Sequence, residues 1–136
     1  MAYMDFVWHF RGVPLLVLTL FVAGGVSAKR KPAPIVKPVI HNGVSYSASG
    51  DGRTEFVVAR DATGGEELWR AKIYSVWIDP SLPGEHQIFI SGLKLAGERL
   101  LIRDEAGRCY QLDLSKRSAR GVSCSVYRAA PISKEQ

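Results

Sequence analysis

The chain of 136 residues lacks any apolar run long enough to cross a membrane. A membrane-spanning helix needs about 20 predominantly apolar residues, and the longest apolar stretch here runs from Val13 to Ala23, with Pro14 and Thr19 inside it. A run of that length is typical of the apolar core of a secretion signal. We therefore expect residues 1–28 to be a signal peptide and not part of the fold.

The residues around the expected cleavage site leave two locations open. Val26 and Ala28 are the small, uncharged residues that signal peptidase needs before a cut, so we expect cleavage after Ala28 and a secreted or periplasmic protein. The basic residues 29–31 follow at once, and the positive-inside rule favours keeping them in the cytoplasm. The alternative is a protein anchored in the membrane by an uncleaved N-terminal helix, with no other contact with the membrane.

The chain is also poor in the residues and motifs that build catalytic and metal sites. Its three histidines, His9, His41 and His86, are scattered, and none lies near a cysteine in the sequence. No serine has the glycine spacing of a nucleophile elbow, no glycine-rich stretch opens a helix with the lysine of a phosphate loop, and no calcium-binding loop pattern is present. We assign no catalytic residue and expect neither a metal nor a cofactor.

Four acidic residues occupy turn regions: Asp51, Asp61, Asp104 and Glu105. Carboxylates in such turns commonly accept hydrogen bonds from nearby backbone amides, and this is the interpretation that we favour. The enzymatic alternative is a small hydrolase that uses an Asp/Glu pair across a cleft.

The charge is distributed unevenly along the chain. Residues 29–43 contain four basic residues and no acidic one, residues 44–114 contain eight basic and eleven acidic ones, and residues 115–136 contain five basic and one acidic. Basic ends attract anionic lipids, cell-wall polymers or nucleic acids. Because no aromatic residues are interleaved with the basic ones for base stacking, we expect no nucleic-acid partner. Solvated tails are the simpler interpretation.

Removing residues 1–28 leaves 108 residues, enough for one domain. Residues 29–43 are rich in proline and lysine and predict an extended linker, because proline restricts the backbone and removes amide donors. A single β domain is then expected over residues 44–128, with a C-terminal tail over residues 129–136.

The remaining pattern predicts strands. Short stretches rich in β-branched and aromatic residues alternate with turn-forming clusters, and no segment has a helical period. The expected strands are 44–48, 55–59, 68–78, 87–91, 99–103, 109–114 and 122–127. We predict a mostly β fold, a small antiparallel sheet or sandwich of hairpins, preceded by the N-terminal signal helix.

The aromatic strand 68–78 supplies the candidate binding residues. Period-two alternation places Trp69, Ala71, Ile73 and Trp77 on one face and Tyr74 on the other. Packing in a core is the simplest explanation of the tryptophans. If one face stays exposed, it would bind a protein or a glycan, and Trp69, Tyr74 and Trp77 are then the candidate residues.

The two cysteines, Cys109 and Cys124, are expected to form a disulfide. If residues 109–114 pair with residues 119–124 through a four-residue loop, the cysteines face each other. Facing Cα atoms of antiparallel strands lie about 4.5–5.5 Å apart, which a disulfide can span. Two buried free thiols are the alternative.

The chain contains an internal repeat. Residues 42–70 and 96–122 each run through a glycine, a strand, an acidic turn with a glycine, an arginine, a strand, an aspartate and a further strand. The first copy contains Ala59-Arg60-Asp61-Ala62-Thr63-Gly64, followed by Glu67-Leu68-Trp69-Arg70. This segment resembles the Asp-x-x-Thr-Gly turn and Leu-Trp strand of a blade of the quinoprotein (PQQ) type of β-propeller.

The resemblance implies blade-like hairpins and an exported location, and it implies no chemistry. The second copy keeps Tyr110-Gln111-Leu112-Asp113 but loses the Thr-Gly and the Trp. A propeller closes with about four to eight blades, and 108 residues hold two at most, so we expect no closed propeller and carry over no quinone-binding residue. The span also resembles small uncharacterised bacterial secreted proteins with similar Leu-Trp, Ile-Asp-Pro and Asp-Glu-x-x-Arg-x-Tyr patterns.

Together these observations favour an exported, non-enzymatic accessory or interaction module of the cell envelope. A sheet edge or an aromatic face would meet a protein, a glycan or a second copy of the chain. A cleft with convergent carboxylates would instead favour the hydrolase.

Overall fold

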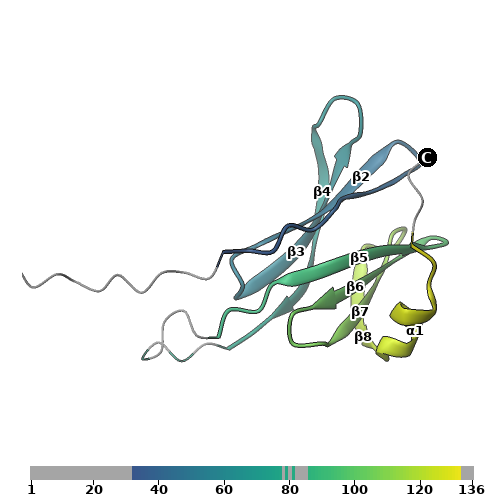
Figure 1. Cartoon of the computed structure of the whole chain (residues 1–136). Coiled ribbons are helices and arrows are strands. Elements are labelled where there is room, and N and C mark those ends of the chain that lie inside the picture. The colour runs from purple at the N-terminus through teal and green to yellow at the C-terminus, as the bar shows by residue number, and fades with distance from the viewer. Residues whose placement is uncertain (1–31, 78, 80, 82–85, 133–136) are drawn as a thin grey trace, which may run out of the picture.

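The computed structural model describes residues 32–77, 79, 81 and 86–132, which form two four-stranded antiparallel sheets and one short helix (Figure 1). The first sheet contains, in order, β1 (Val39–His41), β2 (Val44–Gly50), β3 (Thr54–Asp61) and β4 (Glu67–Ser75). The second contains β5 (Ile90–Ala96), β6 (Arg99–Asp104), β7 (Cys109–Asp113) and β8 (Ser118–Val122). The predicted mostly β fold is confirmed, and the described strands close no propeller.

The predicted signal peptide, residues 1–28, lies outside the described residues. Within the described ranges, no helix has the length and apolar character needed to cross a membrane.

Each sheet is a meander in which every strand pairs with the next one along the chain, because short turns join them. At the first turn His41 pairs with Val44 across Asn42 and Gly43, whose φ angles are 50° and 74°. Two consecutive positive φ angles suit the twist of a hairpin, and Asn-Gly adopts them most readily. This hairpin places β1 inside the range predicted as linker.

The internal repeat of the sequence corresponds to the duplication of the sheet. Its first copy spans β2, β3 and the start of β4, and its second copy spans β6, β7 and β8. Asp61 and Asp113 close corresponding turns, and each accepts hydrogen bonds from the backbone amides two and three residues further on. The repeated aspartates therefore have the same local role in both sheets, and the role predicted for Asp61 is confirmed.

The two sheets pack face to face around one apolar core. β4 lies beside β8, and β1 and β2 lie beside β5. Val57 and Ala59 from the first sheet and Leu100, Ile102 and Leu112 from the second are completely buried in this core. Full burial of each of the valine, leucine and isoleucine side chains contributes about 1.5–3 kcal/mol, so the alternating positions of β3 and β6 hold the sandwich together.

The predicted strand 87–91 is wrong for most of its length. β5 starts only at Ile90 and continues to Ala96. The residues before Ile90 form backbone hydrogen bonds that are not part of a strand pairing. The Ile88 amide donates to the Gly52 carbonyl at 2.9 Å, and the Phe89 carbonyl accepts from the Glu105 amide at 3.0 Å. β5 is a half-buried edge strand containing a glycine and a lysine, which weaken its sequence pattern.

The predicted strand 122–127 is also wrong, because β8 ends at Val122 and helix α1 (Cys124–Ala129) follows. The helix begins after Ser123, whose Oγ accepts a hydrogen bond from the Ser125 amide at 3.4 Å. It packs against β6 and β7 and lies beside the second sheet (Figure 1). α1 has only six residues and none of them is buried. Its sequence therefore has no apolar stripe that could have predicted a helix.

Candidate functional site

The aromatic residues of β4 are placed by a β-bulge. Trp69, Ala71 and Ile73 pack on the core, as predicted, but Tyr74 does so too and is only 8% exposed. The pairing with β3 shifts here: Tyr74 lies opposite Glu55, whereas the next residue of β3 lies opposite Lys72. The extra residue in β4 lets two consecutive side chains face the same side. The prediction that Tyr74 lies on the opposite face is therefore wrong.

The three candidate aromatic residues form no common surface. Trp77 lies beyond the end of β4 and is 83% exposed, so the prediction that it shares the core-facing side is wrong. Trp69 is half-buried between the ring of Tyr46, at a centroid distance of 5.9 Å, and the guanidinium of Arg117, at 5.2 Å. Tyr74 is enclosed in the core.

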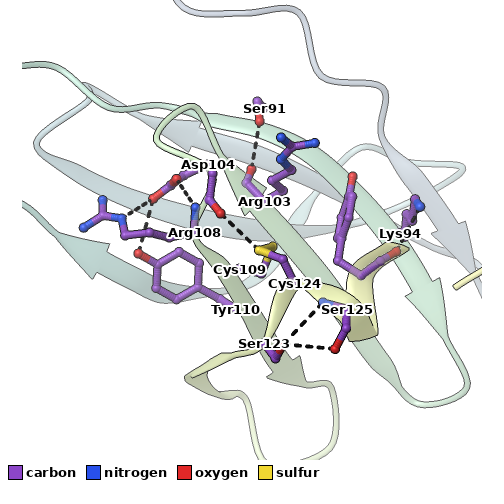
Figure 2. Close-up of a disulfide and its surroundings, with 12 residues drawn as sticks. Ser91, Lys94, Arg103, Asp104, Arg108, Cys109, Tyr110, Ser123, Cys124 and Ser125 are labelled. Carbon is purple, nitrogen blue, oxygen red and sulfur yellow. Dashed lines mark hydrogen bonds and ion pairs between the residues drawn. A yellow bond between two sulfur atoms is a disulfide. The ribbon is translucent and has the colours of Figure 1, made fainter. Parts of the chain in front are cut away.

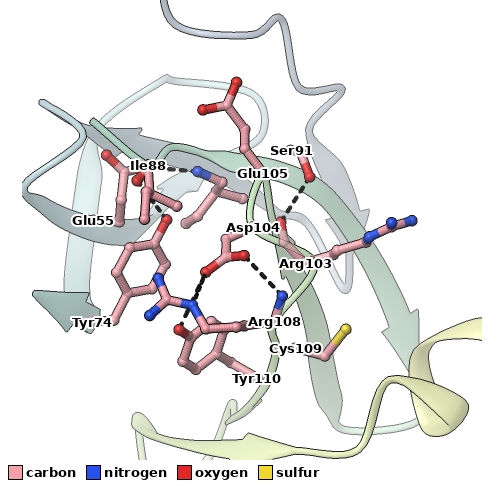
Figure 3. A network of polar contacts seen from close by, with 12 residues as sticks. Glu55, Tyr74, Ile88, Ser91, Arg103, Asp104, Glu105, Arg108, Cys109 and Tyr110 are labelled. Atoms are coloured by element: carbon pink, nitrogen blue, oxygen red, sulfur yellow. Dashed lines mark hydrogen bonds and ion pairs between the residues drawn. The ribbon is translucent and has the colours of Figure 1, made fainter. Parts of the chain in front are cut away.

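A buried polar cluster surrounds Asp104 at the end of β6 (Figure 3). Its Oδ1 accepts from the Arg108 amide at 2.9 Å, and its Oδ2 accepts from Arg108 Nε at 2.8 Å and from the Tyr110 hydroxyl at 3.3 Å. The Tyr110 ring stacks on the Tyr74 ring with centroids 5.0 Å apart. Burial, with the charge of Asp104, raises the pKa of Tyr110, so its hydroxyl keeps the proton that it donates.

A second buried carboxylate, Glu55, links the two sheets. Its Oε1 accepts from the Gly52 amide at 2.9 Å in the turn before β3, and its Oε2 accepts from the Ile90 amide at 3.1 Å at the start of β5. The residue is 2% exposed, and burial raises the pKa of its carboxyl, although the two amide hydrogen bonds oppose this shift. A Cβ on Gly50 would collide with this carboxylate, so glycine is needed there.

The two buried carboxylates serve as hydrogen-bond acceptors for the fold. Every carboxylate oxygen of Glu55 and Asp104 accepts from a protein donor, as burial of a charged group requires. Tyr74, which lies near both, donates to the Ile88 carbonyl at 2.8 Å, and burial followed by the charges of these carboxylates raises its pKa. A general acid or base must instead reach a substrate proton directly or through one water.

The acidic residues of the turns also accept hydrogen bonds from backbone amides, as predicted. Asp51 accepts from the amides of Arg53 and Thr54 at 2.8 and 3.0 Å. Glu105 reaches further and accepts from the Phe89 amide at 3.2 Å, across to the segment that enters β5. The backbone amide bonds hold the pKa of Asp51 below its ordinary value, so this carboxylate stays ionised.

The predicted disulfide between Cys109 and Cys124 is present, with a Cα–Cα distance of 5.2 Å (Figure 2). The predicted register is wrong, because Cys109 lies opposite Val122 and Cys124 is the first residue of α1. The turn after Asp113 closes this hairpin one residue earlier than expected, so the residue opposite Cys109 moves by two positions, from Cys124 to Val122. Cys124 then lies past the end of β8, where the chain turns back as a helix. The disulfide thus ties α1 to the second sheet.

The two histidines within the described part of the chain, His41 and His86, belong to no group of metal ligands. His41 Nε2 lies 3.3 Å from a carboxylate oxygen of Glu98 and 3.0 Å from Asn42 Nδ2, and His86 is exposed. His9 lies outside the described residues. Over the described ranges, no three His, Cys, Asp or Glu residues gather as metal ligands.

The edge of β4 that joins no ladder is the longest unpaired strand edge among the described strands, and part of β4 lies beside β8 of the other sheet. β4 has nine residues and pairs only with β3. The other edge strands, β1, β5 and β8, have three, seven and five residues, and β5 is bound to the end of α1 through Lys94. On β4, Leu68 is 50% exposed. The sequence alone could not identify this edge, because it does not show which strands pair and therefore which strand lies at the edge of its sheet.

Comparison with models of known protein families finds no match, and no curated protein is significantly similar in sequence.

Proposed function

We propose that this chain is a non-enzymatic accessory or interaction module of the cell envelope, which binds an extended segment of a partner protein along the β4 edge. The observation that carries the proposal is this nine-residue strand with one unpaired side. An unpaired edge presents a row of backbone donors and acceptors that a further strand can join.

The side chains of β4 suit a selective edge. Leu68 offers an exposed apolar contact, and next to it Arg70 forms a two-point ion pair with Glu67 at 2.6 and 3.0 Å. Lys72 is exposed further along. Charged side chains and a bulge on an edge strand discourage pairing with unselected strands, so a partner must match both the apolar and the charged positions.

The buried acids weigh against the hydrolase alternative. The carboxylates of Glu55 and Asp104 are less than 3% exposed and engaged by protein donors. An Asp/Glu pair in a glycosidase has to flank the bond that it cleaves, and these two carboxylates hold the turns and the two sheets together instead.

The disulfide supports an exported location. A bond between Cys109 and Cys124 persists in an oxidising compartment and is rare in the cytosol. It fits with the signal peptide expected over residues 1–28. In the same proposal, the two four-stranded meanders correspond to two blades of the quinoprotein type.

The proposal is tested by native mass spectrometry of the protein recovered from cells that produce it, with the envelope fraction kept separate. Leu68→Lys places a charge on the β4 edge. Val126→Lys is the matched control, because Val126 is 44% exposed on α1 while Leu68 is 50% exposed. We expect the wild type and the control to carry a second chain, and the edge variant to lose at least about nine-tenths of it.

Three outcomes would contradict the proposal. If the wild-type protein is always recovered as a single chain, it is not an interaction module. Loss of the partner in both variants, or in neither, would place the contact away from the β4 edge.

A further inference from the structure

A polar hollow of about 310 Å³ lies on the second sheet, on the side away from the core. Its walls come from β6, β7, β8 and the turn between β7 and β8. The lining residues are Arg99, Gln111, Asp113, Lys116, Ser118, Ala119 and Arg120. Pairing explains why they meet: Arg99, Asp113 and Ser118 form one row across the three strands, and Gln111 and Arg120 lie opposite each other in a neighbouring row.

Helix α1 determines where this face stays open. Leu101 lies in the same row as Gln111 but is only 1% exposed, since α1 packs on β6. Lys94 holds the end of the helix by donating to the carbonyls of Tyr127 and Ala130 at 3.0 and 3.3 Å. The part of this outer face that α1 leaves uncovered, around Arg99 and Arg120, forms the hollow.

Three cations line the hollow, and the charge of one of them, Lys116, helps to lower the pKa of Asp113 beside it. The side chains of Arg99, Lys116 and Arg120 are exposed, and none forms an ion pair within the part of the chain that the structure describes. Positive charges around a concave surface reinforce one another's field, and guanidinium groups bind carboxylates and phosphates through two parallel hydrogen bonds. The hollow therefore favours an anionic group.

One carboxylate in the hollow restricts which anion fits. Asp113 Oδ1 accepts from the amides of Ser115 and Lys116 and from the Ser115 hydroxyl, at 3.0, 2.9 and 2.8 Å. Its Oδ2 accepts nothing from the described residues. A bare anion would be repelled by this charge, whereas a ligand with hydroxyl donors beside its anionic group would satisfy Oδ2. Gln111 and Ser118 add further hydrogen-bonding groups.

We propose that this hollow binds a sugar that carries an acidic group. Its volume is at the lower end of the range of small-molecule sites, about 300–1,000 Å³. Arg99, Lys116 and Arg120 would hold the acidic group, and Asp113 would accept from the sugar hydroxyls. No residue of β4 lines the hollow, so the proposal does not rest on the proposed function.

The test is a titration of the isotope-labelled protein, followed through its backbone amide signals, with four probes. They are glucuronate, glucose 6-phosphate, glucose and inorganic phosphate. We expect glucuronate or glucose 6-phosphate to shift the amide signals of Gln111, Asp113 and Ser118 at concentrations where glucose and inorganic phosphate have little effect. The charged sugar that binds more tightly identifies the acidic group as a carboxylate or a phosphate.

Variants separate a built site from general attraction to positive charge. Arg99→Ala with Arg120→Ala should weaken binding of the charged sugar at least tenfold, while Arg128→Ala, an exposed cation on α1, should leave it unchanged. Asp113→Asn retains an oxygen acceptor for the turn. It should weaken binding of the charged sugar and strengthen binding of inorganic phosphate.

The proposal is wrong if neither charged sugar shifts these signals. It is equally wrong if inorganic phosphate or glucose binds as tightly as the charged sugars do, or if Asp113→Asn changes the affinities for sugar and phosphate in the same direction.

Discussion

Removing the disulfide tests how α1 is held and how much the cross-link stabilises the fold. Cys109 is buried on β7, and Cys124 begins a helix that has no buried residue of its own. The other attachments of α1 among the described residues run through Lys94, which donates to the carbonyls of Tyr127 and Ala130 and lies over the Tyr127 ring. The perturbation is the double substitution Cys109→Ala with Cys124→Ala.

The expected loss follows from the length of the closed loop. The cysteines are 15 residues apart, and a loop of about 15 residues restricts the unfolded chain enough to contribute roughly 3 kcal/mol. For a domain of about 100 residues, each kcal/mol corresponds to about 4–8 °C in Tm. The double variant should therefore melt roughly 12–24 °C below the oxidised wild type.

The assays are thermal unfolding for Tm and guanidinium unfolding for the free energy, both followed by tryptophan fluorescence, with and without a reductant. The reduced wild type should match the double variant, and the double variant should not respond to the reductant. An oxidised wild type whose free energy of unfolding exceeds that of the variant by less than about 1 kcal/mol would refute the loop-closure argument. So would a wild-type mass that is not two hydrogens below that of the reduced chain.

Three further predictions follow from single contacts. Leu100→Ala removes a completely buried side chain from the core and should cost about 2–5 kcal/mol in urea unfolding; a smaller loss would mean that the core repacks. A Cβ on Gly92 would collide with the Tyr127 hydroxyl, whereas one on Gly121 meets nothing, so Gly92→Ala should speed hydrogen exchange in α1 and Gly121→Ala should not. Backbone amides hold the pKa of Asp61 below its ordinary value, so its contribution to stability is present above the unfolded-state pKa of about 3.9 and is lost as the pH falls through the lowered value. The urea midpoint of the wild type should consequently drop more steeply below about pH 4 than that of Asp61→Asn, and parallel curves would exclude this role.

Several local features of the fold were predictable because they depend on neighbours in the sequence. Alternation placed Trp69, Ala71 and Ile73 on the core-facing side of β4, since side chains of a strand alternate between its faces. The turn aspartates cap amides only two or three residues away, so their role was visible too. Asn42-Gly43 carried a hairpin signal that would have located β1, had the range not been assigned to a linker.

The errors occur where pairing between segments overrides the local pattern. The bulge in β4 turns Tyr74 inward because β3 presents one residue fewer at that point, which no property of β4 alone reveals. The disulfide was predicted correctly from the wrong register, because two cysteines near one hairpin can meet in more than one way. The candidate aromatic surface failed for the same reason, since Trp77 lies beyond the last paired residue.

The sequence by itself determined the class of fold, the duplication and the cysteine pair, because composition, turn residues and period-two alternation act over a few neighbouring positions. Only the tertiary structure decided which strand edge is open, that Glu55 and Asp104 are occupied by the fold, and that Arg99, Asp113 and Arg120 share one hollow. Those features depend on strand order and register, which are set when distant segments bury their apolar faces against each other.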